Sequence, residues 1–285
     1  MPSGIVVETM DPERTSSVPP RIHPTAVVDR SAQLGPGVTV GPYAVIGPGV
    51  VIGSGTVLHA HVVIEDAVVV GRDNILGVGV ALGCRPQHRR FRNENSGLVI
   101  GDGNTFGEYA TVSRGFGDGT TTEIGSDGYF MSYVRIDHNC RVGDGVTLTS
   151  GAGLAGYVRV DDGAYVGGNG GVHQFVRVGR LAMVGAVSLV RQDVPPYVLA
   201  AGMPARAHSL NVVGLRRAAI LPIHRRAIRR AFTLLYLSRL TVPAAVDAIA
   251  SELGEDPYVA HLVAFMRSGE HHRGFVRWTR ENVSD

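Results

Sequence analysis

The most informative stretch of the sequence is IDHNC, residues 136–140, because its histidine belongs to a series of chemically useful residues at a fixed spacing. His138, Gly156 and Gln174 are each 18 positions apart. In a chain that turned once every 18 residues, they would stack in one column, beside a second column that starts at Asn139. An imidazole can remove a proton at neutral pH, and a glycine N–H can approach a developing oxyanion closely. This set of groups suits acyl transfer from a thioester to an alcohol or an amine.

A sequence period of six residues supplies that geometry. Counting in sixes from Ile22 to Val190, 26 of the 29 positions are Ile, Leu, Val or Phe. A small residue usually stands four places later, and glycine often follows the aliphatic residue directly. A helix period of 3.6 cannot produce this pattern, whereas a β-helix built from hexapeptides does. We therefore predict an all-β parallel β-helix in which three hexads close one triangular coil.

Two polar segments interrupt the repeat, CRPQHRRFRNENSG (84–97) and RGFGDGTTT (114–122), although the phase of six is kept across both. We interpret them as loops that project from the triangular β-helix and have been recruited for function.

After residue 192 the repeat stops, and apolar residues recur at helical spacing from Ile223, with further helices expected around 242–253 and 257–267. Such a helical cap protects the open end of a repeat stack. The predicted parts are an N-terminal extension at 1–20, a hexapeptide-repeat domain at 21–192 and a C-terminal α-helical domain at 193–285.

Composition and charge limit the classes of function. The chain has 38 glycines, and only 18% of its residues are charged, which indicates a tightly turning backbone. All 27 basic residues are arginine and the net charge is +2, with no aromatic stacking platform among the arginines, so the sequence does not favour a nucleic-acid partner. Two cysteines, no apolar run of about 18 residues and no leader-like start predict a reduced, cytoplasmic protein without an integral membrane segment.

A family resemblance rests on five segments of the chain. The combination of VHQF and QDVPPYV with a helical cap resembles the UDP-N-acetylglucosamine 3-O-acyltransferases that begin lipid A synthesis, over about residues 20–278. The resemblance implies a left-handed β-helix, a homotrimer with active sites between neighbouring subunits, and no cofactor or metal. It also implies that an acyl carrier protein delivers a 3-hydroxyacyl chain to the 3-hydroxyl group of a UDP-amino sugar. The segments are IDHNC (136–140), LAGYVRV (154–160), GGVHQFVRVG (170–179), QDVPPYVLAAG (192–202) and LNVVGLRR (210–217).

Matching the family motifs residue by residue implies a role for each matched side chain. His138 corresponds to the general base and Gly156 to the backbone oxyanion donor, while Asn139 is the residue after the base. Ala186 falls where the family sets the acyl length, usually with glycine for longer chains, so we expect a slightly shortened acyl pocket. The residues expected to contact the substrates are Gln87, His88, Arg135, Tyr157, His173, Gln174, Asn211 and Arg217.

The sequence departs from the family pattern around the expected substrates. The family base is normally followed by Asp, whereas Asn139 can orient an imidazole but supplies no negative charge. These departures leave the acceptor open between UDP-N-acetylglucosamine and a close analogue, such as its 3-amino form. The other departures are Ser113, Arg135 and Tyr157 in place of histidines, His88 beside Gln87 in place of a loop acid, and Val213 in place of an acid near the nucleotide.

Three alternatives to this enzyme are also compatible with parts of the pattern. A non-catalytic or altered-substrate paralogue that binds a nucleotide sugar or acyl carrier protein would explain the missing acid after His138. A carbonic anhydrase-like trimer needs three histidines around one metal ion, and no third histidine is near His138 or His173, so we predict no metal site. The N-acyltransferase that acts later in lipid A assembly fits VHQF and the helical cap less well.

The expected partner is acidic, and the cap is basic. Between Pro195 and Val246 there are eight arginines and no acidic residue. Positive surface charge raises the rate at which an acidic carrier protein associates. We therefore expect acyl carrier protein to dock on the cap, although solvated helix faces would give the same composition.

Overall fold

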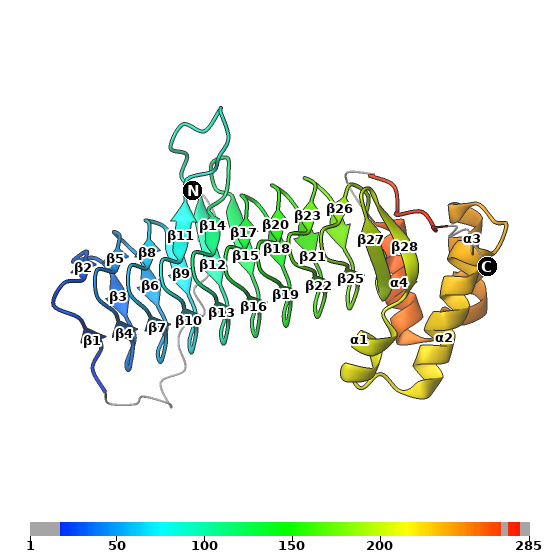
Figure 1. Cartoon of the computed structure of the whole chain (residues 1–285), viewed down its shortest axis with the longest axis horizontal. Helices are drawn as coiled ribbons and strands as arrows, with labels where there is room; N and C mark the ends of the chain where they lie inside the picture. The colour runs from blue at the N-terminus through cyan, green and yellow to red at the C-terminus, as the bar shows by residue number, and fades with distance from the viewer. Residues whose placement is uncertain (1–17, 269–272, 280–285) are drawn as a thin grey trace.

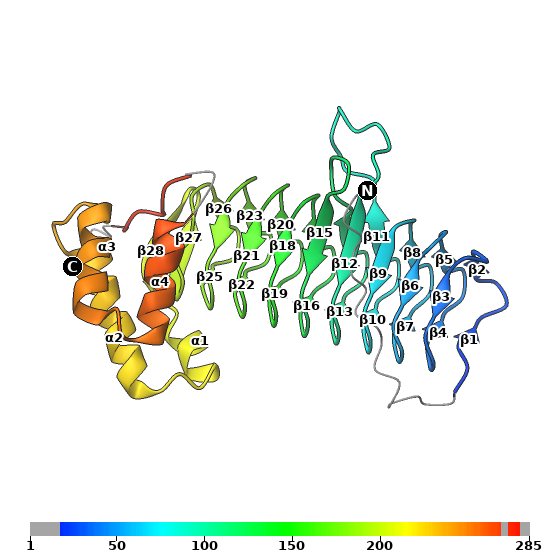
Figure 2. The same cartoon turned by 180° about the vertical axis from the view of Figure 1, so that it is seen from behind.

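The computed structural model describes residues 18–268 and 273–279, so the predicted extension at 1–20 lies almost wholly outside the described residues. The described chain forms an elongated triangular prism with a helical cap at one end (Figure 1, Figure 2). The prism is a left-handed parallel β-helix, which confirms the predicted fold class. Its three sheets are called faces A, B and C in the order in which the chain visits them.

The three faces consist of very short strands that pair from coil to coil. Face A contains β1 (Arg21–Ile22), β4 (Thr39–Val40), β7 (Val57–Leu58), β10 (Ile75–Leu76), β13 (Thr105–Phe106), β16 (Tyr129–Phe130), β19 (Thr147–Leu148), β22 (Tyr165–Val166), β25 (Met183–Val184), β27 (Val198–Gly202) and β28 (Ala205–Leu210). Face B contains β2 (Val27–Val28), β5 (Val45–Ile46), β8 (Val63–Ile64), β11 (Ala81–Cys84), β14 (Thr111–Ser113), β17 (Arg135–Ile136), β20 (Gly153–Leu154), β23 (Gly171–Val172) and β26 (Leu189–Val190). Face C contains β3 (Gln33–Leu34), β6 (Val51–Ile52), β9 (Val68–Val70), β12 (Gly97–Ile100), β15 (Thr121–Ile124), β18 (Arg141–Val142), β21 (Arg159–Val160) and β24 (Arg177–Val178).

The strand register confirms the 18-residue coil. On face B, Ile136 pairs with Leu154 and Leu154 pairs with Val172, all in parallel. These three side chains point inward and are at most 3% exposed. Removing an aliphatic side chain of this kind from water stabilises the fold by about 1.5–3 kcal/mol. The period of six therefore reflects one inward aliphatic residue per face.

The two polar segments are insertions into this register. Ala81 pairs with Thr111, which is 30 residues later, so the first loop adds 12 residues to its coil. Thr111 pairs with Arg135, 24 residues later, so the second loop adds six. Because both insertions are multiples of six, the aliphatic phase continues across them. The predicted loops are confirmed, and both project from the same edge of the prism (Figure 1).

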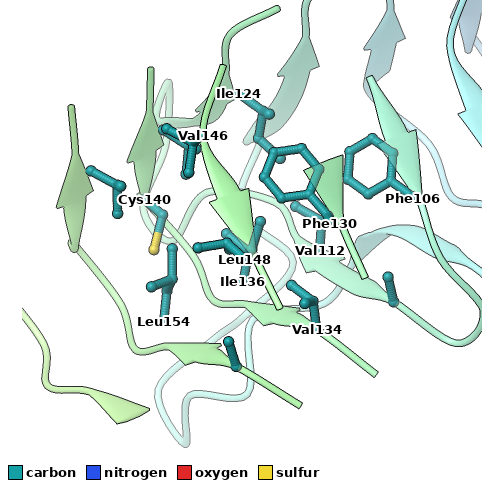
Figure 3. Close-up of a cluster of buried hydrophobic side chains, with 14 of the residues drawn as sticks. Phe106, Val112, Ile124, Phe130, Val134, Ile136, Cys140, Val146, Leu148 and Leu154 are labelled. Atoms are coloured by element: carbon teal, nitrogen blue, oxygen red, sulfur yellow. The ribbon is translucent and has the colours of Figure 1, made fainter. Parts of the chain in front are cut away.

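The interior is a continuous apolar column (Figure 3). The rings of Phe106 and Phe130 stack in successive coils with centroids 4.7 Å apart. Aliphatic side chains such as Ile136 and Leu148 fill the neighbouring layers and are fully buried. Close packing of this kind resists changes of side-chain volume, so the interior holds the edge residues in a fixed position.

Helices close the C-terminal end of the prism, and they begin near the predicted positions. Arg177 ties the prism to this cap, because its Nη1 donates to the carbonyl oxygen of Phe265 at 3.0 Å and its guanidinium lies over that ring at 4.3 Å. The Nε of Arg177 also donates to Asp193 at 2.8 Å. The helices are α1 (Val212–Arg217), α2 (Pro222–Phe232), a π-helical turn η2 (Thr233–Leu237), α3 (Val242–Leu253) and α4 (Pro257–Arg267).

Candidate active site

The candidate site lies on the B–C edge, which is the set of turns that lead from face B to face C. The turn between β17 and β18 carries His138, and the turns of the next two coils carry Gly156 and Gln174. Both inserted loops leave from this edge, one coil and two coils before His138. The structure therefore places eight of the predicted residues in or beside one region: Arg135, His138, Asn139, Gly156, Tyr157, His173 and Gln174 in successive coils, with His88 in the first loop.

The imidazole of His138 is held by Asn139. Its Nδ1 lies 2.9 Å from Asn139 Oδ1, which also accepts a hydrogen bond from the backbone N–H of Phe116 at 2.9 Å. Because a backbone N–H can only donate, the Asn139 atom must be the oxygen, and His138 Nδ1 must be the protonated nitrogen. The free electron pair is therefore on Nε2, which is the state that a general base requires.

Backbone geometry favours asparagine at position 139. Its φ angle is 58°, in the left-handed region that Asn tolerates better than most residues. Its N–H donates to the buried Thr122 Oγ1 at 2.8 Å, which anchors the turn to face C. Asn139 thus joins the turn that carries His138 to the second loop through Phe116, while its neutral side chain adds no negative charge beside the imidazole.

Gly156 makes room for the imidazole. A Cβ atom at this position would lie 2.6 Å from His138 Cε1 and 2.8 Å from Nε2, closer than real Cβ atoms approach. Among the described residues, the N–H of Gly156 donates to no protein acceptor. Gly156 is buried, and a buried N–H usually has a partner, so this amide is suited to receive an oxygen from a bound substrate.

Aromatic rings surround the imidazole of His138. Tyr157 meets it edge-on with ring centroids 5.3 Å apart, and Tyr157 itself stacks on Phe175 at 4.9 Å. On the loop side, the ring of Phe116 lies 5.4 Å from that of His138, and His88 lies 4.1 Å from Phe116 and 5.9 Å from His138. These rings limit the directions from which a substrate can reach Nε2.

Two of the predicted residues on or near this edge have other polar contacts within the chain. Arg135 projects from face B and donates from Nη2 to both carboxylate oxygens of Asp137, at 2.9 and 2.8 Å. His173 is half-buried, and its Nδ1 lies 3.3 Å from the carbonyl oxygen of Gln174. Gln174 and the loop residue Gln87 are exposed.

Three of the predicted residues lie elsewhere in the chain. Asn211 caps α1, since its Oδ1 accepts from Gly214 N and its Nδ2 donates to Leu181 O, both at 2.9 Å. Arg217 is exposed at the end of α1, which belongs to the cap and lies away from β17 (Figure 1). Ala186 is exposed on the A–B edge, the set of turns from face A to face B.

Phe116 is the site residue that sequence reasoning missed. It contributes both an aromatic wall and the N–H that fixes the Asn139 amide. It belongs to the six residues that the second loop adds, so the 18-residue spacing assigns it to no column. Its only sequence signal was its place in a loop that interrupts the repeat.

Cys140, which directly follows Asn139, is fully buried. Burial raises the pKa of the Cys140 thiol to about 12, which leaves it protonated and a poor nucleophile at neutral pH. Among residues 18–268 and 273–279, no three His, Cys, Asp or Glu side chains are grouped so as to hold a metal ion. In the same part of the chain, no helix has both the length and the apolar character needed to cross a bilayer.

Comparison with known proteins assigns the family. A family model described as "Udp N-acetylglucosamine O-acyltransferase; Domain 2" matches residues 193–276, and one described as "Bacterial transferase hexapeptide (six repeats)" matches residues 19–54. The acyl-(acyl-carrier-protein)–UDP-N-acetylglucosamine O-acyltransferase of Burkholderia vietnamiensis is 47% identical over 262 residues, covering 90% of this chain and 99% of the relative. The chain belongs to this O-acyltransferase family.

Solved structures of O-acyltransferase relatives agree with this assignment. The Francisella novicida UDP-N-acetylglucosamine acyltransferase superposes with a TM-score of 0.87 at 34% identity, covering 91% of this chain and 95% of that one. The Campylobacter jejuni UDP-N-acetylglucosamine acyltransferase gives a TM-score of 0.84 at 31% identity, covering 91% of this chain and all of that one. The family predicted from the sequence and its enzyme class are therefore confirmed.

Proposed function

We propose that this chain transfers a 3-hydroxyacyl group from acyl carrier protein to the 3-position of UDP-N-acetylglucosamine or a close analogue, the first step of lipid A synthesis. The supporting relatives are named for an acyl-carrier-protein donor and a UDP-N-acetylglucosamine acceptor. The observation that carries the proposal is the pairing of an oriented imidazole with an unpaired amide: Nδ1 of His138 is bound to Asn139, and its ring lies against Gly156.

The geometry supports a direct attack on the thioester. His138 Nε2 removes the proton of the sugar hydroxyl as its oxygen bonds to the thioester carbon. The carbonyl oxygen then carries the negative charge and accepts a hydrogen bond from the Gly156 N–H. When the tetrahedral intermediate collapses, the C–S bond breaks, and the imidazolium returns the proton to the departing thiolate.

The test is turnover with the named substrates. Purified protein is incubated with 3-hydroxyacyl carrier protein and UDP-N-acetylglucosamine, and acylated sugar is measured by mass spectrometry. Loss of a general base lowers kcat by about 10²–10⁴, so His138→Ala is expected to fall in that range. Arg30→Ala is the control, because Arg30 is exposed at the same turn position of the B–C edge in an early coil, between β2 and β3. Tight binding of both substrates without product would instead favour a non-catalytic paralogue.

The acceptor is the least constrained part of the proposal. In this chain Arg135 is neutralised by Asp137, and an imidazole, His88, takes the place of the family's loop acid beside His138. Both features change the charge that meets the sugar. A competition assay between UDP-N-acetylglucosamine and its 3-amino analogue measures the preference directly as a ratio of kcat/KM.

We also propose a homotrimer that works in the cytoplasm, with residues 193–285 as the cap domain. Asn211 and Arg217 belong to the two ends of α1, and α1 lies away from β17 within one chain (Figure 1), as expected if the nucleotide is bound between neighbouring copies. Light scattering of the purified protein tests the trimer. Apolar side chains that are exposed in the single chain support the trimer, because contact with neighbouring copies would bury them. They lie on faces A and B and on the A–B edge: Val27, Val45, Ile75, Tyr109, Tyr129, Tyr133 and Val187.

Two further elements of the proposal concern the acyl donor. Arg216, Arg225, Arg226 and Arg229 line a groove of about 310 Å³ beside α1 and α2, which supports docking of the acidic carrier protein on the cap. Ala186 on the A–B edge is proposed to limit the acyl chain. A donor series of increasing chain length tests this, since Ala186→Gly is expected to shift the optimum toward longer chains.

A further inference from the structure

Arg114 is a buried arginine at the start of the second loop, and the proposed reaction does not use it. Only 7% of its side chain is exposed, and its Nη1 donates to Asp66 Oδ1 at 2.7 Å. Asp66 lies in the B–C turn between β8 and β9, two coils before Arg114. The first loop leaves the prism from the coil between them. The side chain of Arg114 therefore spans the coil that carries the first loop.

The first loop contacts Arg114 and its neighbour at three points. The N–H of Arg114 donates to the carbonyl oxygen of Cys84 at 3.0 Å, at the start of that loop. The N–H of Gly115 donates to the carbonyl oxygen of Gly97 at 3.0 Å, at its end. The guanidinium of Arg114 also lies over the ring of Phe91, 5.6 Å from the ring centroid, in the middle of the loop. The start of the second loop thus holds the first loop at both ends and in the middle.

Phe91 connects this contact to the candidate site. Its N–H donates to the carbonyl oxygen of His88 at 3.0 Å, so Phe91 and His88 belong to one turn. The ring of His88 lies 4.1 Å from that of Phe116 and 5.9 Å from that of His138, measured between centroids. A shift of Phe91 would therefore move the imidazole of His88 relative to that of His138.

The outer parts of the two loops are joined independently of Arg114. The N–H of Gly119 donates to the carbonyl oxygen of Asn95 at 2.7 Å, and the N–H of Asn95 donates to Asp118 Oδ1 at 2.9 Å. These bonds fix the first loop near its C-terminal end. Loss of the Arg114 side chain is therefore expected to loosen the His88 turn while the two loops stay joined.

We propose that Arg114 is a positioning residue for the sugar nucleotide, because its guanidinium, held by Asp66, fixes the Phe91–His88 turn beside His138; this inference rests on the proposed function. A guanidinium can pair with a carboxylate through its edge and present its face to an aromatic ring at the same time. Replacing a buried ion pair by apolar residues of similar volume is often neutral or stabilising. Stability alone therefore does not require an arginine at this position.

The experiment uses two single variants and their combination in the full chain. Phe91→Leu removes the ring from a half-buried loop residue, and Arg114→Met keeps a long side chain without its charge. Each is expected to raise KM for UDP-N-acetylglucosamine about fivefold or more, as for loss of a desolvated cation–π contact, with a smaller change in kcat. The double variant should resemble Arg114→Met, because both substitutions break one contact. Single effects that multiply in the double variant would contradict this.

The split between KM and kcat separates positioning from lost stability. A partly unfolded variant has fewer active molecules, so its apparent kcat falls while its KM stays the same. A KM equal to that of the wild type, in either variant that remains folded by circular dichroism, overturns the proposal. Phe91→Leu decides the question if Arg114→Met does not fold.

Hydrogen–deuterium exchange tests the loop without turnover. Peptides from residues 85–92 are expected to exchange about fivefold faster or more in Phe91→Leu and Arg114→Met, because local opening costs less free energy. Arg177→Met is the matched control, since Arg177 also joins a carboxylate, Asp193, to an aromatic ring, Phe265, but at the junction with the cap. Unchanged exchange in the two loop variants, or an equal increase in Arg177→Met, overturns the inference.

These measurements keep the inference separate from the proposed function. If the wild-type protein makes no acylated sugar, the proposed function has failed. Calorimetric titration with UDP-N-acetylglucosamine then replaces KM. Faster exchange of the loop together with weaker binding in the Phe91 and Arg114 variants supports the positioning role, whereas wild-type exchange in both variants overturns it.

Discussion

The B–C edge and the C–A edge, where the chain turns from face C to face A, are built on the same turn. They differ in whether one backbone N–H of that turn has a side-chain acceptor. On the C–A edge, Asp144 accepts from the N–H of Ser126 at 2.7 Å, and Asp162 accepts from the N–H of Asp144 at 3.0 Å. Each turn amide is thus capped by a side chain one coil later. On the B–C edge the equivalent amides belong to His138 and Gly156, and neither donates to a protein acceptor among the described residues.

This difference means that one repeating turn can leave its N–H either capped or open. At Ser126 and Asp144 the cap is the side chain of the residue 18 positions later. The side chain of Asp162 caps the N–H of Asp144. Gly156 has no side chain, which leaves space for the imidazole of His138. An uncapped donor beside a base is what acyl transfer requires.

A large effect is expected when the open space at Gly156 is filled. Gly156→Ala places a methyl group against the imidazole of His138, so that either the ring or the turn must move. A displacement of about 1 Å at a reacting group lowers the rate by about 10², and kcat is expected to fall by this factor. Steady-state kinetics measure it. Gly168 holds the same turn position on the A–B edge, where a Cβ meets only ordinary contacts, so a similar loss in Gly168→Ala would contradict the interpretation.

A second variant would give the B–C edge the capped arrangement of the C–A edge. Gln174 lies one coil after Gly156, as Asp162 lies one coil after Asp144. Gln174→Asp is expected to cap the Gly156 N–H and to lower kcat by about 10²–10³, the usual cost of losing one oxyanion donor. Gln174→Ala removes the amide without adding a cap, so kcat should exceed that of the Asp variant. Equal kcat values for the two variants would show that the amide takes no part.

Substitutions of Asn139 test whether the orientation of the His138 imidazole matters for turnover. Asn139→Ala removes the hydrogen bond that fixes the protonated nitrogen of His138, and kcat is expected to fall about tenfold or more, as for a misoriented base. Asn139→Asp keeps an oxygen at this position and adds negative charge. A neighbouring carboxylate favours the imidazolium and raises the pKa of the histidine. The acidic limb of the kcat/KM profile should therefore move to higher pH in Asn139→Asp.

The smallest effect is expected on the C–A edge. Asp162→Ala removes the cap of the Asp144 N–H, but Asp162 is exposed, so water can replace it. The free energy of unfolding should fall by about 0.5–1.5 kcal/mol, the net value of a typical hydrogen bond. Urea denaturation measures this loss, and kcat should be unchanged. A large loss of activity in this variant would remove the contrast between the edges.

Much of the B–C edge follows from spacing alone. The 18-residue coil, the stacking of His138 below Gly156 and the two loops were all predicted, because each depends only on a period that the aliphatic residues display. The inserted lengths of 12 and six residues preserve that period, so the loops did not disturb the register. The position of Phe116 could not be predicted, because a residue inside an insertion has no partner in the repeat.

The sequence by itself determined the prism, because one inward aliphatic residue in every hexad is the pattern of a β-helix with three hexads per coil. It also determined which residues share an edge. The tertiary structure alone decided what those residues do to one another. The amide of Phe116 orients Asn139, which in turn sets the proton on His138, and Asn211 proves to be the cap of α1. Periodicity specifies position along the chain, whereas the direction of a hydrogen bond depends on groups that the folded loops bring together.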